Sequence, residues 1–205
     1  MDKLTLSNPV VIVVIGLPGA GKSFFATQFA TSLDVALVSE DKIRWTLFAH
    51  HTYNENENAI VKQVANMMVA ELFKTKETFI LDGGHNDRAS RAILTTQAKK
   101  AGYDVFTVIV QTDTPTAKQR STKRHAKKAS NLYTQPIDGN TFETQCKKYQ
   151  APLRIERTTI VISGKHTYST QARIVLKKIL GTQGDTLPAE QHPTPAVRPY
   201  GPLVQ

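Results

Sequence analysis

The chain has 205 residues, 40% of them hydrophobic, which is typical of one packed domain with a short tail. No apolar run approaches the ~18 residues that cross a bilayer, and the N-terminal residues lack a signal-peptide pattern. A cytoplasmic protein without membrane contact is therefore expected. The single cysteine, Cys146, excludes an internal disulfide framework and a cysteine metal cluster. The net charge of +9 favours an anionic partner such as a nucleotide or a nucleic acid.

Strands and helices are predicted to alternate along the first half of the chain. The apolar run 10–15 predicts a buried strand, and a helix is expected over 22–32. The predicted inner face of this helix consists of Phe24, Phe25, Phe29 and Leu33. A strand over 35–38 and a short helix from Asp41 lead into a long helix over 56–74. The predicted buried side of the long helix consists of Ile60, Val64, Met67, Met68 and Leu72.

The second half of the chain continues this alternation. Strands are predicted at 78–81, 105–110 and 159–162, and helices at 88–101, 115–129, 141–149 and 170–180. The pattern indicates an α/β fold, a five-stranded, mainly parallel sheet with helices on both faces, in which ligands bind at the carboxyl ends of the strands. We expect one domain over residues 1–180, with a helical lid over about 115–150, and a proline-rich, flexible tail over 181–205.

A glycine-rich segment directly follows the first predicted strand. Residues 16–23 fit the pattern G-x-x-x-x-G-K-[ST], the phosphate-binding P-loop, in its usual place between a strand and a helix. The glycines let the backbone N–H groups turn inward toward a polyphosphate. Lys22 is expected to reach the β- and γ-phosphates of ATP, and Ser23 to hold Mg²⁺. The predicted ATP-binding residues here are Gly16, Pro18, Gly19, Ala20, Gly21, Lys22, Ser23 and Phe24.

An acidic and a basic residue follow the second predicted strand, one helical turn apart. Asp41 can accept a proton from a substrate hydroxyl, and Arg44 can hold a phosphate or a carboxylate, because the spacing places both on one helix face. The alternative is structural: the acidic residue complements the helix dipole and forms a salt bridge with the arginine. Beside a P-loop, we favour a catalytic and substrate-binding role for both.

A further aspartate ends the third predicted strand. Asp82 follows the apolar residues 79–81, which is the arrangement that supports Mg²⁺ in P-loop proteins, directly or through water. The glycines after it leave room for a substrate, so Gly83, His85 and Arg88 are candidate substrate-binding residues. Asp87 is a plausible N-cap for the helix that follows.

A basic segment lies in the predicted lid. Six lysines and arginines between 118 and 128 have no acidic residue among them, which is otherwise typical of a solvated face. Downstream of a P-loop, we expect this segment to close over phosphates. Arg120 and Arg124 are four residues apart, and either one is placed to stabilise charge on the transferred phosphoryl group.

Together, these segments resemble the P-loop kinase family that contains the kinase domain of phage-type polynucleotide 5′-hydroxyl kinase. The resemblance covers about residues 9–180 and rests on residues 16–23, 39–44, 81–82 and 118–124. It implies that Asp41 is the general base, that Arg44 serves the acceptor phosphate and the transition state, and that Arg124 is the lid arginine, with Arg120 as second choice. One departure concerns the acceptor pocket, because the family often has Asp-x-Asn where this chain has Asp82-Gly83-Gly84.

The sequence therefore predicts an ATP- and Mg²⁺-dependent kinase that phosphorylates a hydroxyl group. The favoured acceptor is the 5′-hydroxyl of a nucleic acid or a nucleotide. Two alternatives stay open: a kinase of small metabolites or nucleotide sugars, as in the zeta-toxin-like relatives of the family, and a non-catalytic module that binds ATP or nucleic acid. The acceptor and the oligomeric state are not decided by the sequence.

Overall fold

The computed structural model describes residues 8–123, 133 and 135–184. Its strands are β1 (Val10–Ile15), β2 (Ala36–Ser39), β3 (Phe79–Asp82), β4 (Asp104–Gln111) and β5 (Thr159–Ser163). Its helices are α1 (Lys22–Leu33), α2 (Glu40–Leu47), α3 (Glu55–Thr75), α4 (Arg88–Lys100), α5 (Thr114–Thr122), α6 (Gly139–Lys148) and α7 (Tyr168–Gly184). None of the described helices is long and apolar enough to cross a membrane.

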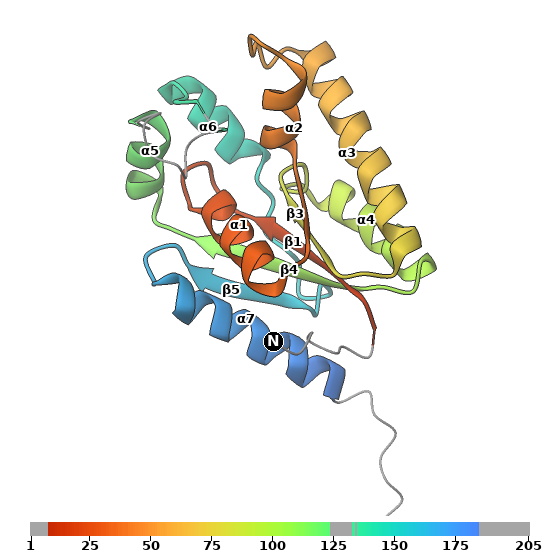
Figure 1. The fold of residues 1–205 in the computed structure, drawn as a ribbon. Helices are drawn as coiled ribbons and strands as arrows, with labels where there is room; N and C mark the ends of the chain where they lie inside the picture. The colour runs from red at the N-terminus through yellow and green to blue at the C-terminus, as the bar shows by residue number, and fades with distance from the viewer. Residues whose placement is uncertain (1–7, 124–132, 134, 185–205) are drawn as a thin grey trace, which may run out of the picture.

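The strands form a single five-stranded sheet in the order β2-β3-β1-β4-β5, in which every described pair is parallel (Figure 1). The predicted α/β fold is thereby confirmed. All six residues of the central strand β1 are at most 1% exposed, because helices cover both faces of the sheet. This explains why β1 is a continuous apolar run rather than an alternating one.

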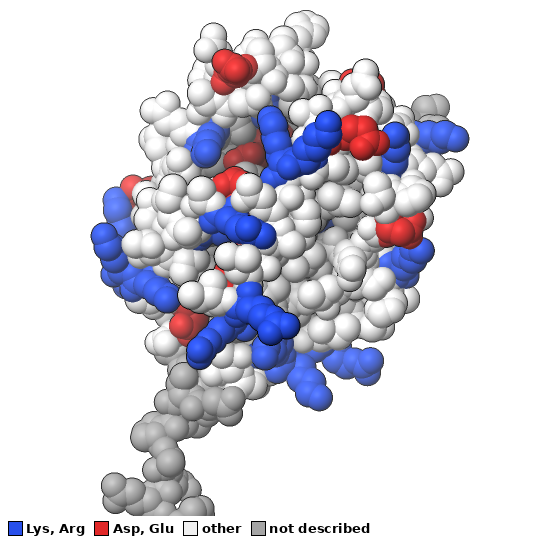
Figure 2. Space-filling model, turned by 180° about the vertical axis from the view of Figure 1, so that it is seen from behind, with Lys and Arg blue, Asp and Glu red and all other residues white. Residues whose placement is uncertain are grey.

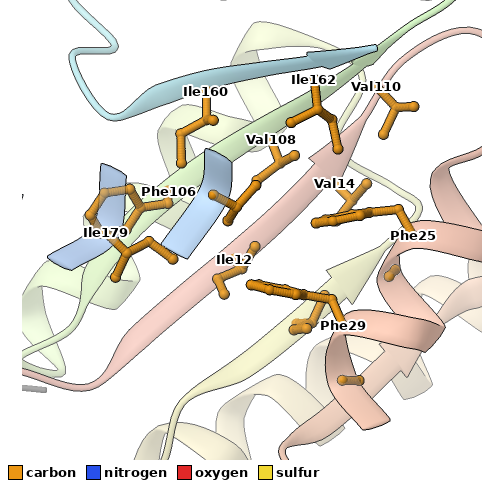
Figure 3. Close-up of a cluster of buried hydrophobic side chains, with 14 of the residues drawn as sticks. Ile12, Val14, Phe25, Phe29, Phe106, Val108, Val110, Ile160, Ile162 and Ile179 are labelled. Atoms are coloured by element: carbon orange, nitrogen blue, oxygen red, sulfur yellow. The ribbon is translucent and has the colours of Figure 1, made fainter. Parts of the chain in front are cut away.

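Each face of the sheet has its own hydrophobic core. On one face, α1 and α7 pack against the sheet in a cluster (Figure 3) that includes Ile12, Phe25, Phe29, Phe106 and Ile179. On the other face, residues of α2, α3 and α4 pack against the alternate positions of β1, in a cluster that includes Val11, Val13, Ile43, Val69 and Leu94. The second core brings α2 and α3 to the edge of the sheet where β2 and β3 end.

The predicted buried side of α3 was wrong at three of its five positions, because only Val64 and Leu72 are partly buried and pack against the second core. Ile60, Met67 and Met68 are 46%, 63% and 40% exposed, whereas Val61 and Val69 are buried. Two stripes of residues compete on this helix, and the stripe with smaller side chains, spaced four residues apart, lies against the sheet. The larger side chains therefore lie on the outer side.

The inner face of α1 also differs from the prediction at one position. Phe24 is 47% exposed, whereas Phe25 and Phe29 are fully buried and stack on each other with ring centroids 5.0 Å apart. Successive residues of a helix point about 100° apart, so Phe24 cannot share the face that its neighbour occupies.

Two helix ends differ from those expected. The basic helix, predicted to continue to residue 129, ends as α5 at Thr122, where the hydroxyls of Ser121 and Thr122 donate to the carbonyl of Lys118. Such local bonds compete with helix continuation. At the other end of the chain, α7 passes Gly181 and reaches Gly184, within the segment expected to be a flexible tail.

Candidate functional site

Three segments with polar residues meet at one edge of the sheet. Asp82, the last residue of β3, is level with Val14 of β1 on one side and with Ser39 of β2 on the other. The loop 16–21 therefore begins beside the point where α2 and the loop after β3 begin (Figure 1). Parallel strands place their following loops on the same side, and this is where ligands bind in open α/β sheets.

The loop before α1 has the backbone of an anion cradle. Gly21, the N-cap of α1, has a left-handed backbone with φ of 106°, and no side chain caps the helix N-terminus. Gly21 has no side chain that could accept from the first N–H groups of α1, and a helix N-terminus carries partial positive charge, as a phosphate site requires. A side chain at Gly19 would place its Cβ 2.2 Å from the carbonyl oxygen of Ala117, so α5 packs directly against the loop.

Other parts of the fold hold this loop in place. The N–H of Gly16 donates to Oδ1 of Asn86 at 3.1 Å, and the hydroxyl of Thr112 donates to the carbonyl of Ala20 at 3.1 Å. The Nζ of Lys22 donates to the carbonyl of Leu17 at 3.0 Å, which places its ammonium group across the loop. The loop is thus anchored from the segments that follow β3 and β4, and its lysine lies across the same loop. These features fit a nucleoside triphosphate.

The candidate Mg²⁺ ligands come from the first turn of α1 and from the end of β3. Ser23 is half-buried in the first turn of α1, and Asp82 is 5% exposed and accepts a hydrogen bond from the hydroxyl of Ser39 at 3.3 Å. Among the described residues, no group of three or more His, Cys, Asp or Glu side chains is arranged to hold a metal ion. This donor set fits Mg²⁺, which commonly takes only one or two protein ligands and completes its shell with phosphate oxygens and water.

Arg44 has a different environment from the one the sequence suggested. It is 5% exposed, forms a short ion pair with Glu57, and donates to Oδ1 of Asn58 at 2.8 Å. Its guanidinium also lies over the ring of Tyr53, 4.4 Å from the centroid. Because these partners belong to α3 and the loop before it, Arg44 joins α2 to α3 rather than opening toward a substrate.

Glu57 is the buried acid that holds this arginine. It also accepts hydrogen bonds from the N–H and the hydroxyl of Thr52, at 2.6 and 2.7 Å, and from the N–H of Tyr53 at 3.1 Å. Burial alone would raise the pKa of this carboxyl, but the hydrogen bonds from Thr52 and Arg44 outweigh it and lower the pKa from 4.5 to about 2. Glu57 is therefore ionised at neutral pH. It is a site-supporting residue that the sequence analysis did not identify.

Arg91 of α4 organises the loop after β3. It is 2% exposed, and its Nη1 donates to the carbonyls of His85 and Asn86, both at 3.1 Å. Its Nη2 donates to the carbonyl of Gln150 at 2.9 Å, and its Nε donates to Glu156 at 2.8 Å. Because Asn86 accepts from the P-loop, Arg91 connects the P-loop to the segment after α6. The sequence contains one signal for this role: Arg91 lies on the apolar stripe of α4, where a charged side chain requires a buried partner.

The predicted substrate-binding residues lie close to this loop. Nδ1 of His85 is 2.8 Å from the carbonyl of Gly83, and burial lowers the pKa of the His85 imidazole. Arg88 is exposed, and its Nε donates to the carbonyl of Ala151 at 3.0 Å. The predicted N-cap Asp87 is confirmed, because its side chain accepts from the N–H of Ser90.

The first turn of α2 carries two acidic residues, Glu40 and the predicted base Asp41. Asp41 is half-buried. A side chain at Gly84 would place its Cβ 2.2 Å from Oε1 of Glu40, so the glycines after β3 leave room for this carboxyl group. Burial raises the pKa of Glu40, and the charge of Asp41 adds to that rise.

The lid arginines are only partly described. Arg120 is exposed on α5, and its Nη1 donates to the carbonyl of Gly164 at 3.2 Å. Arg124 lies outside the described residues. On the face turned away from the viewer in Figure 1, Lys and Arg side chains predominate over acidic ones, in keeping with the net charge of +9 (Figure 2).

Comparison with known proteins supports a nucleotide-binding kinase fold. The family model AAA_33, described as an AAA domain, matches residues 11–152. A curated relative is described as a bifunctional polynucleotide phosphatase/kinase of Acanthamoeba polyphaga mimivirus. It is 29% identical over 116 residues, which are 56% of this chain and 24% of that protein. This chain thus spans about a quarter of that relative's length.

Solved structures of this fold include several kinases. Kti12 of Chaetomium thermophilum, in complex with ADP-AlF3, has a TM-score of 0.62 and 22% identity over 84% of this chain and 98% of that one. The APS kinase CysC of Mycobacterium tuberculosis, in complex with AMPPNP and APS, has a TM-score of 0.59 and 18% identity over 84% of this chain and 98% of that one. Because the family model covers more than half of the chain, this protein belongs to the AAA_33 family of AAA domains, and its fold is that of a P-loop kinase.

Proposed function

We propose that this chain is an ATP-dependent phosphotransferase that moves the γ-phosphoryl group to a hydroxyl group. The observation that carries the proposal is the shared sheet edge, where the uncapped N-terminus of α1 lies beside the acidic residues that follow β2 and β3. A donor phosphate on one side and a proton acceptor on the other are what in-line transfer to an alcohol requires.

On the donor side, the P-loop amides and Lys22 hold the β- and γ-phosphates of ATP. Ser23 and Asp82 are the side chains that would hold Mg²⁺, which would neutralise phosphate charge. Ser39 orients the Asp82 carboxylate through their hydrogen bond. Arg124 would contribute positive charge from the lid, with Arg120 as the second choice.

On the acceptor side, Asp41 accepts the hydroxyl proton as the hydroxyl oxygen forms its bond to the γ-phosphorus. The bond between that phosphorus and the bridging oxygen breaks, and ADP leaves. Arg44 serves this step as a positioning residue, because its ion pair with Glu57 holds the helix that carries Asp41. Hydroxyl groups are weak nucleophiles, so the aligned base and the positioned donor supply most of the rate.

The favoured acceptor is the 5′-hydroxyl of a nucleic acid or a nucleotide. The net charge of +9 supports an anionic partner, and the mimivirus relative is described as acting on polynucleotides. Phosphate contacts would make acceptor affinity fall steeply with salt concentration.

The test is transfer of labelled phosphate from ATP, with Mg²⁺, to a panel of 5′-hydroxyl oligonucleotides, nucleosides and sugars. We expect the label to appear as a 5′-phosphate on the acceptors that had a 5′-hydroxyl group. Asp41→Asn should lower kcat by at least about 100-fold and leave the ATP dissociation constant unchanged. The matched control is Asp104→Asn, the same change at the opposite end of the sheet, in the first residue of β4.

If Asp41→Asn had a normal kcat, Asp41 would not be the general base. ATP binding without a labelled product from any acceptor would show a binding module instead of an enzyme.

A further inference from the structure

A cavity lies between α3, α4 and the ends of β2 and β3. Its volume is about 330 Å³, close to the lower limit for small-molecule pockets, so it accommodates one ring-sized group and not a longer chain. Asp82, Gly83 and His85 line it, so it adjoins the sheet edge at which the P-loop begins.

The walls of this cavity are of two kinds. One part is apolar: Val69, Phe73, Leu81 and Leu94 belong to the second core, and the exposed side chain of Ile93 lies at its border. The other part carries the side-chain amides of Asn66 and Gln97 and the ammonium group of Lys62. Amides both donate and accept hydrogen bonds, so this second part suits the polar edge of a ring whose faces are apolar.

The charges that line the cavity disfavour an anionic occupant. Glu40 and Asp82 contribute two carboxyl groups, whereas Lys62 contributes the one ammonium group among the lining residues. A phosphate or a sugar acid inside the cavity would lie close to both carboxyl groups. A neutral sugar would place hydroxyl groups against the apolar wall without partners, which costs free energy. A nucleobase avoids both penalties.

We propose that this cavity receives the uncharged terminal nucleoside of the acceptor, with its base against the apolar wall and its phosphates outside. The inference rests on the proposed function, and it assigns the choice of acceptor to residues of α3. Ala70 is the most useful of them, because it is exposed, lines the cavity and is not part of the phosphoryl-transfer machinery. Leucine at this position would fill part of the cavity and keep a high helix propensity.

The experiment uses the full chain, with Ala70→Leu as the test variant and Ala92→Leu as its matched control. Ala92 is an exposed residue of α4 that does not line the cavity. The first measurement is the KM for a 5′-hydroxyl oligonucleotide and for the same oligonucleotide with an abasic terminal nucleotide. The second is the fluorescence change when 2-aminopurine riboside is added without ATP, which does not depend on phosphoryl transfer.

We expect the KM of the wild-type protein to rise at least tenfold when the terminal base is absent. Ala70→Leu should raise the KM for the complete oligonucleotide by a similar factor, with the KM for ATP unchanged, and should abolish riboside binding, whereas Ala92→Leu changes neither. The inference would be overturned if the two leucine variants had the same KM for the oligonucleotide and the same affinity for the riboside. Preferential phosphorylation of a sugar or a sugar acid would also overturn it. If the wild-type protein phosphorylates nothing but binds the riboside, and Ala70→Leu abolishes that binding, the proposed function fails whereas the cavity remains a nucleoside-binding site.

Discussion

Removal of the Arg91 side chain is expected to weaken both the fold and nucleotide binding. The Arg91 side chain is 3% exposed and that of Glu156 is 25% exposed, so this ion pair is largely shielded from water. Arg91→Ala removes one donor from the Glu156 carboxylate and from each of the carbonyls of His85, Asn86 and Gln150. Breaking a buried pair by deletion of one partner costs about 3–5 kcal/mol, and the partial exposure of Glu156 favours the lower end, about 3 kcal/mol.

That loss has two measurable consequences. For a chain of 205 residues, about 3 kcal/mol corresponds to a decrease in Tm of roughly 6–12 °C. The loop that presents Asn86 to the N–H of Gly16 also loses its support. If that hydrogen bond contributes about 1 kcal/mol to the binding-competent P-loop, the ATP dissociation constant should rise about fivefold. Calorimetric unfolding and ATP titration measure the two effects.

The control is Glu71→Gln, which breaks an exposed pair with Lys74 on α3 in which the side chains are 71% and 70% exposed. Such pairs contribute about 0.2–0.5 kcal/mol, so Tm should change by no more than about 2 °C. If Arg91→Ala is no more destabilising than this control, or if ATP affinity is unchanged although Tm falls, the connection between Arg91 and the P-loop is wrong.

Two further predictions concern α3 and its pair with α2. The first concerns the pKa of Glu57, which is lowered from 4.5 to about 2. The ionised carboxyl therefore stabilises the fold fully above pH 4.5, and this stabilisation is lost as the pH falls toward 2. Over this pH range, the free energy of urea-induced unfolding should decrease less steeply in Glu57→Gln than in the wild-type protein. The second concerns the orientation of α3. In the same assay, Val69→Ala should lower the free energy of unfolding by about 1–2 kcal/mol, because Val69 is buried. Met67→Ala, at a 63% exposed position, should change it by less than about 0.5 kcal/mol, and equal losses in the two variants would contradict this orientation.

The features that the sequence predicted well are those determined by neighbouring residues. The apolar runs identified each strand, and the P-loop pattern placed an anion-binding turn between β1 and α1. The cap of α4 follows the same rule, because the predicted N-cap Asp87 accepts a hydrogen bond from the N–H of Ser90, three residues ahead. Periodicity was less informative for α3, where two stripes matched the helical repeat and only packing against the sheet selected one.

The residues that support the site were not predictable in this way. The spacing of Asp41 and Arg44 suggested that both face a substrate, yet Arg44 is buried against Glu57, which belongs to another helix. The sequence analysis assigned no role to Asn86 or to Arg91. Their roles depend on Gly16 and Glu156, which are 70 and 65 positions away.

By itself, the sequence determined the order of strands and helices, the P-loop and the sheet edge at which we propose phosphoryl transfer, because hydrophobic periodicity and turn chemistry act over a few neighbouring residues. Tertiary structure alone decided which face of α3 is buried, which acid neutralises Arg44 and which side chains line the cavity beside Asp82. Those features depend on how separate helices pack against the sheet. Burial then demands a partner for each buried charge, and no local pattern specifies where in the chain that partner lies.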